Sequence, residues 1–357
     1  MPGSNPAPRD ARSGLPAAKR GRVWQALVVL VVGLILGIGV RQLVFVIDFS
    51  PASELPIRPV TVRVQSASQV AETREALVEY LFDEPQLPSS LPIDNGDGTY
   101  TVRMQLGLES LVRFFHPTNP NGRLVLYHSG HAGYVEPDQT AVDELVSRGN
   151  TVLVFDMPLT GINARPLTVE LPNGPVTISR HDHMAYLDPL TPGSPIRFFV
   201  EPVVVMVNEF GGQYADITMI GLSGGGWTTT LAAAIDTRID RSYPVAGTLP
   251  MAVQFAREDA WGDWEQNEPT LYAIADYPDL YVLGAHQRRQ LQVLNEFDPC
   301  CFGGDHRSIY ESQVQEALSA AGGGSFDVFV DTDNRQHSIG RMSLEAIYSD
   351  METTSAN

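Results

Sequence analysis

The sequence contains very little cysteine and almost no lysine. Its two cysteines among 357 residues are the neighbours Cys300 and Cys301, and Lys19 is the single lysine. Two cysteines cannot build a disulfide framework in a chain of this length, and no Cys-x-x-Cys spacing is present to hold zinc. We expect the pair to occupy a turn, either as thiols or as a disulfide between neighbours.

Positive charge is scarce beyond the first residues of the chain. The sequence has 24 Lys and Arg against 42 Asp and Glu, which leaves a formal net charge of −18. Residues 1–22 hold five of the basic side chains, so the rest is strongly acidic. Proteins that bind nucleic acid need a positive surface to displace counterions, so we expect no nucleic-acid partner. The acidity indicates nothing more specific, because it commonly serves solubility.

One long apolar run follows this basic tail. Residues 23–40 carry no charge, and Gln25 is their one strongly polar side chain. The run is close to the ~20 residues that a membrane-spanning helix needs, and it lacks an amphipathic stripe. We therefore predict a membrane anchor over residues 23–47, with the tail 1–22 in the cytoplasm and the acidic body outside. A cleaved export signal is the alternative, and it would make the protein secreted.

The remainder of the chain divides into an extension and a regular body. Residues 48–98 are rich in Pro, Ser and acidic side chains and are predicted to be an N-terminal extension or linker, with a strand at 57–64 and a helix at 70–82. In residues 99–351 apolar strands alternate with helices, which is typical of a mostly parallel sheet covered on both faces. The strands are expected at 100–106, 124–127, 151–155, 217–220, 242–245, 290–294 and 326–330, and the helices at 140–147, 197–210, 231–235, 309–321 and 343–349.

An aromatic-rich insertion, residues 250–288, interrupts this alternation. It carries Phe255, Trp261, Trp264 and three tyrosines among many acidic side chains. Long loops in compact domains are often lids over a site, but packed aromatics would explain the composition equally well.

The most informative motif is Gly221-Leu-Ser223-Gly224-Gly225. An apolar strand precedes it and a helix-favouring run follows, which is the context of a G-x-S-x-G nucleophile elbow. The apex residue of such an elbow is strained, so its neighbours must lack bulk. The beginning of the helix places free N–H groups and a positive dipole end beside the serine. Gly-Ser-Gly turns also occur in ordinary loops, but the flanking strand and helix favour the elbow.

A nucleophilic serine needs a base, and the base needs an orienting group. His337 follows the last strand and precedes the last helix, and Asp298 follows the preceding strand. Loops at the carboxyl ends of parallel strands gather site residues, and the order Ser223, Asp298, His337 is that of the hydrolase fold. The other candidates for the acid are Glu296, Asp305 and, from the insertion, Asp263.

Backbone N–H groups are also required for the oxyanion that develops in acyl transfer. We expect one from Gly224 and the second from Gly130 or His131, in the loop after the strand at 124–127. His128, His131 and His181 suggest a metal-dependent hydrolase as an alternative. Histidines without a clustered carboxylate make a poor zinc site, so we expect neither a metal nor an organic cofactor.

Taken together, these features resemble the α/β-hydrolase superfamily over roughly residues 100–350. The resemblance rests on His128-Ser-Gly-His131, on Phe155-Asp-Met-Pro-Leu-Thr-Gly161, on the elbow, and on Asp298 and His337. It implies a mostly parallel sheet of about eight strands with helices on both faces, and a Ser-His-Asp triad. Two features depart from the common pattern: His-Ser-Gly replaces a His-Gly pair, and Gly226 adds a third glycine at the start of the helix.

The predicted function is hydrolysis of carboxylic esters by a serine hydrolase through an acyl-enzyme, acting on a small-molecule, lipid or sugar ester. A serine peptidase or an acyltransferase would use the same triad. A non-catalytic, membrane-tethered binding protein on the same fold is the alternative from another class, because a fold does not determine a function.

Overall fold

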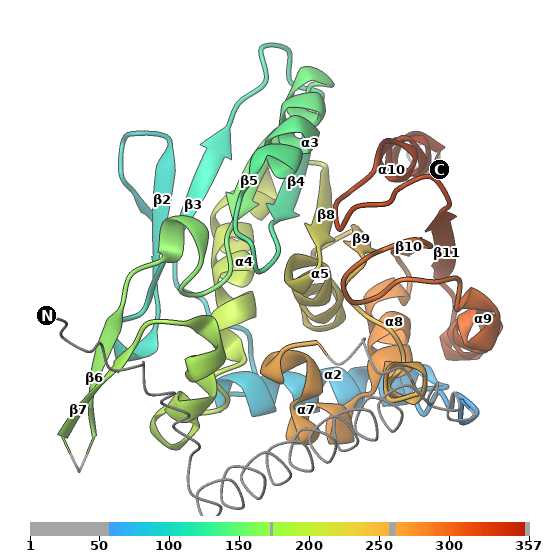
Figure 1. Ribbon diagram of the computed structural model, residues 1–357, viewed down its shortest axis with the longest axis horizontal. Helices are drawn as coiled ribbons and strands as arrows, with labels where there is room; N and C mark the ends of the chain where they lie inside the picture. The colour runs from blue at the N-terminus through green and yellow to red at the C-terminus, as the bar shows by residue number, and fades with distance from the viewer. Residues whose placement is uncertain (1–56, 172–173, 257–261, 354–357) are drawn as a thin grey trace, which may run out of the picture. The chain divides into compact units, whose positions relative to one another are not determined.

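The computed structural model describes residues 57–171, 174–256 and 262–353, and a nine-stranded sheet forms the centre of this part of the chain (Figure 1). The strand order is β1-β2-β3-β5-β4-β8-β9-β10-β11. Within this sheet, β5, β4, β8, β9, β10 and β11 are parallel. β1, β2 and β3 extend the sheet in antiparallel fashion. The strands are β1 Ile93–Asp94, β2 Thr99–Arg103, β3 Glu109–Phe115, β4 Arg123–His128, β5 Thr151–Phe155, β8 Asp216–Leu222, β9 Arg241–Val245, β10 Arg289–Asn295 and β11 Ser325–Asp331.

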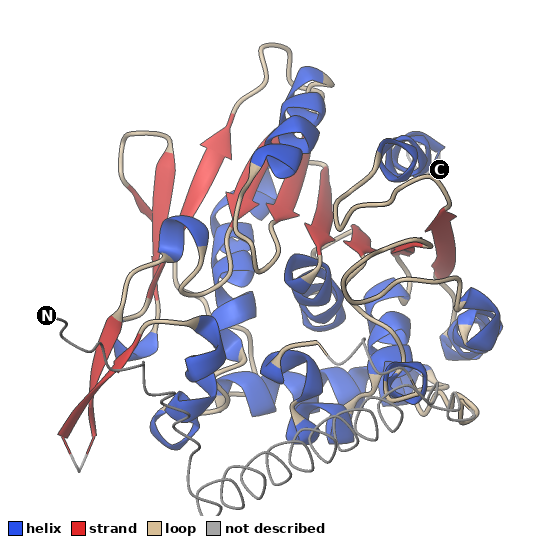
Figure 2. Cartoon of the chain, in the orientation of Figure 1, coloured by secondary structure: helices blue, strands red, loops and turns tan. Residues whose placement is uncertain are grey.

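Helices cover both faces of the sheet, as Figure 2 shows. α3 and α10 pack on one face, and α4, α5, α8 and α9 lie with α2 in the core of the other face. Side chains of β4 alternate between the two cores: Leu124 and Leu126 enter one, and Val125 and Tyr127 enter the other. The helices are α2 Ala67–Phe82, α3 Glu136–Ser147, α4 Arg197–Phe210, α5 Gly224–Ile235, α6 Met251–Gln254, α7 Pro269–Ile274, α8 Tyr277–Ala285, α9 Glu311–Ala321 and α10 Arg341–Thr353.

The predicted alternation of strands and helices is confirmed, and the sheet is larger than the expected eight strands. The excess lies at its antiparallel end, where β1 pairs with β2 and where β3, which the sequence did not reveal, joins β2 to β5. A second, two-stranded sheet of β6 Leu167–Leu171 and β7 Gly174–Ile178 leads into the 3-10 segment η3 His181–Leu190.

The extension behaves differently from the prediction. The strand expected at 57–64 is wrong, because the backbone N–H groups of Arg63 and Val64 donate to one carboxylate oxygen of Asp279, at 2.7 and 3.1 Å, instead of to a neighbouring strand. The helix at 70–82 is confirmed as α2, which packs against α5, α7 and α8. The described residues all belong to one compact unit, so the described part of the extension packs as part of the body.

Most aromatics of the insertion are packed side chains. α8 lies against α5, and the rings of Tyr277 and Tyr281 are fully buried. The part of the insertion that approaches the candidate site is residues 262–267, with the short 3-10 helix η5 Trp264–Asn267 (hereafter the η5 segment).

The predicted membrane anchor lies outside the described residues. Within the described ranges, no helix combines the length and apolar character needed to cross a bilayer. Cys300 and Cys301 form a disulfide between neighbours in the turn after β10, which is one of the two states expected for them.

Candidate active site

Ser223 sits at the apex of a sharp turn between β8 and α5. Its backbone angles are φ 57° and ψ −123°, a region that a non-glycine residue rarely occupies. The turn is held on both sides: the Ser223 N–H donates to the Val245 carbonyl, and the Ser223 carbonyl accepts from the Trp227 N–H, each at 2.9 Å. Strain of this kind persists only where the surrounding structure holds the residue in place, as these two hydrogen bonds do. A strained serine between a strand and a helix is the geometry of a nucleophile elbow.

Close backbone contacts explain the glycines around the serine. A Cβ atom on Gly225 would lie 2.1 Å from the His128 carbonyl oxygen, and one on Gly226 would lie 2.7 Å from the Val245 carbonyl oxygen. The third glycine therefore lets α5 approach β9, and the helix begins at Gly224 without loosening. Three threonines that follow Trp227 strengthen this turn, because their hydroxyl groups donate to the carbonyls four residues earlier: Thr228 to Gly224, Thr229 to Gly225 and Thr230 to Gly226.

His337 and Asp298 meet through a hydrogen bond of 2.8 Å between Nδ1 and Oδ2. The Asp298 side chain is fully buried, and it also accepts from the Cys300 N–H at 2.8 Å and from the Asn295 amide at 3.3 Å. Burial by itself would raise the pKa of this carboxyl, but the hydrogen bonds from His337 and Cys300 outweigh it and lower the pKa below its ordinary value. Asp298 is therefore an ionised acceptor that orients the imidazole.

The other ring nitrogen of His337 is the atom that a general base would use. Within the described residues, Nε2 of His337 is buried and has no hydrogen-bond partner, and no hydrogen bond joins it to Ser223. β8, β10 and β11 run parallel, so Ser223, Asp298 and His337 all follow the carboxyl ends of strands at one edge of the sheet. The Asn295 side chain reinforces this edge by also donating to the Ser338 carbonyl at 3.0 Å. Asn295 was not predicted as a site residue, because an amide in a strand carries no distinctive signal in the sequence.

The loop between β4 and α3 lies directly against the serine. A Cβ atom on Gly130 would be 2.8 Å from the Cβ of Ser223 and 3.4 Å from its Oγ. The absence of a side chain at Gly130 therefore keeps the space beside the serine hydroxyl open. Ser129 anchors this loop by donating to the buried carboxylate of Asp156 at 2.6 Å.

His128 is the buried last residue of β4, directly before this loop. Its Nδ1 lies 2.8 Å from the Ser129 carbonyl oxygen. Burial lowers the pKa of this imidazole to about 4, because the interior disfavours the charged form. His128 is thus a neutral packing residue at neutral pH.

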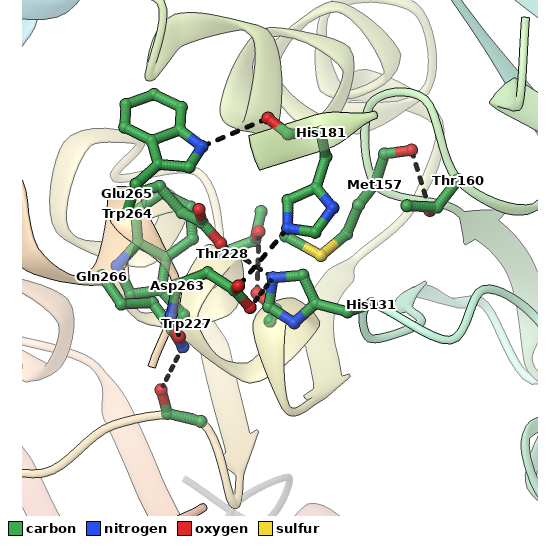
Figure 3. A network of polar contacts seen from close by, with 12 residues as sticks. His131, Met157, Thr160, His181, Trp227, Thr228, Asp263, Trp264, Glu265 and Gln266 are labelled. Carbon is green, nitrogen blue, oxygen red and sulfur yellow. Dashed lines mark hydrogen bonds and ion pairs between the residues drawn. The ribbon is translucent and has the colours of Figure 1, made fainter. Parts of the chain in front are cut away.

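His131 belongs to a second cluster of polar side chains, shown in Figure 3. Its Nε2 lies 2.8 Å from Glu265 Oε1 and 3.0 Å from Asp263 Oδ2, both in the η5 segment. His181 Nε2 lies 3.7 Å from the other oxygen of Asp263. Burial would lower the pKa of His131, but its hydrogen bonds to Asp263 and Glu265 raise it to about 9.

This second cluster adjoins the elbow. A Cβ atom on Gly224 would lie 2.6 Å from Cε1 of His131. His128, His131 and His181 were the histidines of the alternative metal-dependent hydrolase, and the sequence showed no carboxylate beside them. In the structure His128 points elsewhere, and the insertion supplies two carboxylates. Glu265 was missed because no pattern in the sequence connects it with His131, which lies 134 positions earlier.

The remaining candidates for the triad acid do not contact His337. Asp263 pairs with His131 and His181, and Asp305 pairs with Arg307. The Glu296 backbone N–H donates to the Asp331 carbonyl, and within the described residues its carboxylate makes no hydrogen bond or ion pair with His337. Asp298 is thus the carboxylate that the fold brings to His337.

The sheet order, the strained serine after β8 and the residue pair after β10 and β11 define the α/β-hydrolase fold. No protein-family model matches the sequence, and none of the curated proteins does.

Solved structures with this fold are similar to the chain at low sequence identity. Methylesterase BT1017 has a TM-score of 0.58 and 17% identity, over 79% of this chain and 62% of that one, so the match spans less than two thirds of its length. An acetyl xylan esterase from Paenibacillus sp. R4 has a TM-score of 0.50 and 15% identity, over 85% of this chain and 99% of that one. Acetyl xylan esterase 1 from Thermoanaerobacterium sp. JW/SL YS485 has a TM-score of 0.50 and 13% identity, over 82% and 94%. At such identities the likeness shows the fold alone.

Proposed function

We propose that this protein is a serine hydrolase that cleaves carboxylic esters. The observation that carries the proposal is the backbone of Ser223, whose φ of 57° and ψ of −123° place a hydroxyl at a strained apex in front of the N-terminus of α5. The His337–Asp298 hydrogen bond supports it, because it is the orienting half of a triad. A strained serine and a carboxylate-bound histidine at one edge of the sheet are explained together by a shared role in proton transfer during catalysis.

In the proposed reaction the Ser223 hydroxyl attacks the acyl carbon while Nε2 of His337 takes its proton. The protonated imidazole then gives that proton to the departing alcohol, which leaves an acyl group on Ser223. Water attacks this acyl-enzyme with its proton going to His337, and the carboxylic acid leaves as the proton returns to Ser223. Asp298 keeps the proton of the neutral imidazole on Nδ1, so that Nε2 can accept one, and it stabilises the imidazolium.

The oxyanion is assigned to backbone N–H groups on either side of the serine. One is the N–H of Gly224, the first residue of α5, where the helix dipole adds positive potential. The other is the N–H of Gly130 or His131, from the loop that lies against Ser223. The departure from a His-Gly pair in this loop is compatible with the assignment, because Gly130 supplies the required lack of bulk.

The choice of esters rests on the named neighbours. One is a methylesterase and two are acetyl xylan esterases, so esters with a small acyl or alkoxy group are the first substrates to test. A peptidase or an acyltransferase would employ the same residues, and the tests below separate these outcomes.

Active-site labelling with a fluorophosphonate probe tests the nucleophile. The full-length chain should be labelled, and Ser223→Ala should not. Ser242→Ala is the matched control, because Ser242 is fully buried in β9 and its hydroxyl has no hydrogen-bond partner among the described residues. Equal labelling of wild type and Ser223→Ala would overturn the assignment.

Turnover then distinguishes an esterase from a peptidase and from a binding protein. Wild-type protein should hydrolyse p-nitrophenyl acetate faster than the matching anilide, and the Ser223→Ala variant should hydrolyse neither. Preference for the anilide would favour a peptidase. Labelling without hydrolysis of esters or amides, and without acyl transfer to an added alcohol, would favour a non-catalytic role.

We also propose that residues 23–47 anchor the protein in a membrane, with the catalytic body on the extracytoplasmic side. The support is the uncharged run 23–40 behind a basic tail. We expect the full-length chain to stay in the membrane pellet after alkaline carbonate washing. We also expect externally added protease to digest its body. Recovery of a shortened chain in the medium would instead indicate a cleaved signal.

A further inference from the structure

Four potential metal ligands converge beside the elbow from three separate parts of the chain. His131 comes from the loop after β4, His181 begins η3, and Asp263 and Glu265 belong to the η5 segment. One ligand atom from each lies within 4.8 Å of all the others. Figure 3 shows the two imidazole rings and the Asp263 carboxylate turned toward one another, with Glu265 beside them. From this arrangement we propose that His131, His181, Asp263 and Glu265 bind one divalent transition-metal ion, with zinc as the best match.

The distances suit a small tetrahedral ion. Zinc bound at about 2.0–2.1 Å holds its four ligand atoms roughly 3.3 Å apart. His131 Nε2 lies 2.8 Å from Glu265 and 3.0 Å from Asp263, and His181 Nε2 lies 3.7 Å from Asp263. These three separations lie within about half an ångström of that value, and all four ligand atoms are within 4.8 Å of one another, so side-chain shifts of up to roughly 1.5 Å would gather them around one centre.

The donor set selects among the metals. Calcium and magnesium are bound by oxygen atoms, whereas imidazole nitrogen suits zinc and its neighbours in the first transition row. Two neutral imidazoles and two carboxylates carry a charge of −2, which a divalent cation balances. In the described part of the chain, the ion-pair partners of Asp263 and Glu265 are these two histidines.

Two unpartnered buried atoms point independently to a missing ligand. Glu265 is fully buried, and its Oε2 has no hydrogen-bond partner among the described residues. Nε2 of His181 is buried as well, and its 3.7 Å separation from Asp263 is too long for a hydrogen bond. A buried carboxylate oxygen without a partner is costly, and a metal ion in the cluster would satisfy both atoms together.

The site would have a positioning role. It joins the η5 segment to η3 and to the loop that carries Gly130, one of the proposed oxyanion donors. The Trp264 indole already donates to the His181 carbonyl at 3.2 Å, so the metal would reinforce a contact that exists between the same two segments. Our assignment opposes the expectation from the sequence that no metal is bound.

The test is zinc binding by the tag-free full-length chain after removal of metal with a chelator. Isothermal titration with Zn²⁺ and elemental analysis after dialysis should give about one zinc per chain. His181→Ala and Glu265→Gln should each weaken zinc binding by about 100-fold or more, beyond the 10–100-fold that loss of an outer hydrogen-bond partner causes. His183→Ala, in the same η3 segment, and Glu268→Gln, just after η5, are matched controls that should bind as wild type does.

Two further readouts keep the result interpretable. Co²⁺ in place of zinc should give the intense visible absorption of a tetrahedral site in wild type and not in His181→Ala. Zn²⁺ should raise the Tm of wild type and leave that of Glu265→Gln unchanged, because only binding to the folded state stabilises it. Circular dichroism of the metal-free variants shows whether each one is folded, and either folded variant suffices for the comparison.

Zinc binding that is equally tight in wild type and in the folded variants would overturn the proposal. So would a wild-type chain that takes up no zinc, in which case the cluster is an ion-pair network around a protonated His131. Ser223→Ala should bind zinc as wild type does. This variant therefore separates failure of the metal proposal from failure of the proposed hydrolase function.

Discussion

Two histidine–carboxylate clusters lie at the candidate site, and they differ in which imidazole nitrogen contacts the carboxylate. In the first, His337 gives Nδ1 to Asp298 and keeps Nε2 without a partner. In the second, His131 engages Asp263 and Glu265 through Nε2 itself. A general base needs a free nitrogen directed at its substrate, whereas a metal ligand or an ion-paired cation does not. This difference supports proton transfer as the proposed role of the first cluster and a holding role as the proposed role of the second.

The two clusters also differ in which parts of the fold bring their residues together. Asp298 and His337 follow adjacent parallel strands, so the sheet itself places them together. Asp263 and Glu265 follow no strand closely; they arrive from an insertion after β9 and reach His131 across the elbow. The first pair follows from the order of the strands in the sheet, whereas the second cluster depends on the path of the insertion.

The largest expected effect is the loss of the base. His337→Ala should lower kcat for p-nitrophenyl acetate by about 10⁶-fold, because a serine without its base is a weak nucleophile. Steady-state kinetics measures this, with His183→Ala as the control histidine that should retain activity. If His337→Ala stays active and His131→Ala is dead, the assignment of roles to the two clusters is reversed.

The acid should matter somewhat less than the base. Asp298→Asn should lower kcat by about 10⁴-fold, because an amide no longer keeps the Nδ1 proton in place or stabilises the imidazolium. Glu296→Gln is the matched control in the same turn and should behave as wild type. The opposite pattern, with activity lost only in Glu296→Gln, would show that the observed hydrogen bond is not the working one.

A smaller effect is expected from the loop against the serine. Gly130→Ala introduces a Cβ atom about where the Ser223 side chain lies, only 2.8 Å from its Cβ. We expect kcat to fall by about 10²–10³-fold, the range for loss of one oxyanion donor. KM should change little, and an unaltered circular dichroism spectrum confirms the fold. Wild-type kcat in this variant would contradict the tight placement of the loop against the serine, because the added Cβ atom should displace the backbone N–H groups of the loop.

The smallest effect concerns stability, at a third histidine that has no carboxylate partner. Burial holds the pKa of His128 at about 4, below the value of about 6.5 in an unfolded chain. Between these two pH values the unfolded state binds the extra proton, so stability is complete above about pH 6.5 and declines as pH falls toward 4. The decline amounts to about 3 kcal/mol from this group.

Urea unfolding of wild type and His128→Gln between pH 7 and pH 4 measures this contribution. The wild type should lose about 3 kcal/mol more than the variant over this range. Parallel pH curves for the two proteins would show that His128 is not held neutral by the fold. His183→Ala, at a partly exposed position, should follow the wild-type curve.

Local chemistry made much of the framework predictable. The apolar runs at 151–155 and 197–210 coincide with β5 and α4, because a strand buried on both faces and a helix buried nearly all round need continuous apolar sequence. β3 escaped prediction because its residue types do not alternate with its burial: Ser110 is buried, whereas Leu111 is only partly buried. The strand expected at 57–64 failed because the side chain of Asp279, more than 200 residues away, accepts hydrogen bonds from the N–H groups of Arg63 and Val64.

By itself, the sequence determined the alternation of strands and helices and the position of the strained serine. Both follow from short-range sterics and periodicity, which act within a few residues. Only the tertiary structure decided which carboxylate meets His337 and which side chains surround His131. Those contacts depend on the order in which strands lie in the sheet and on the path of an insertion, so they join residues that no local pattern relates.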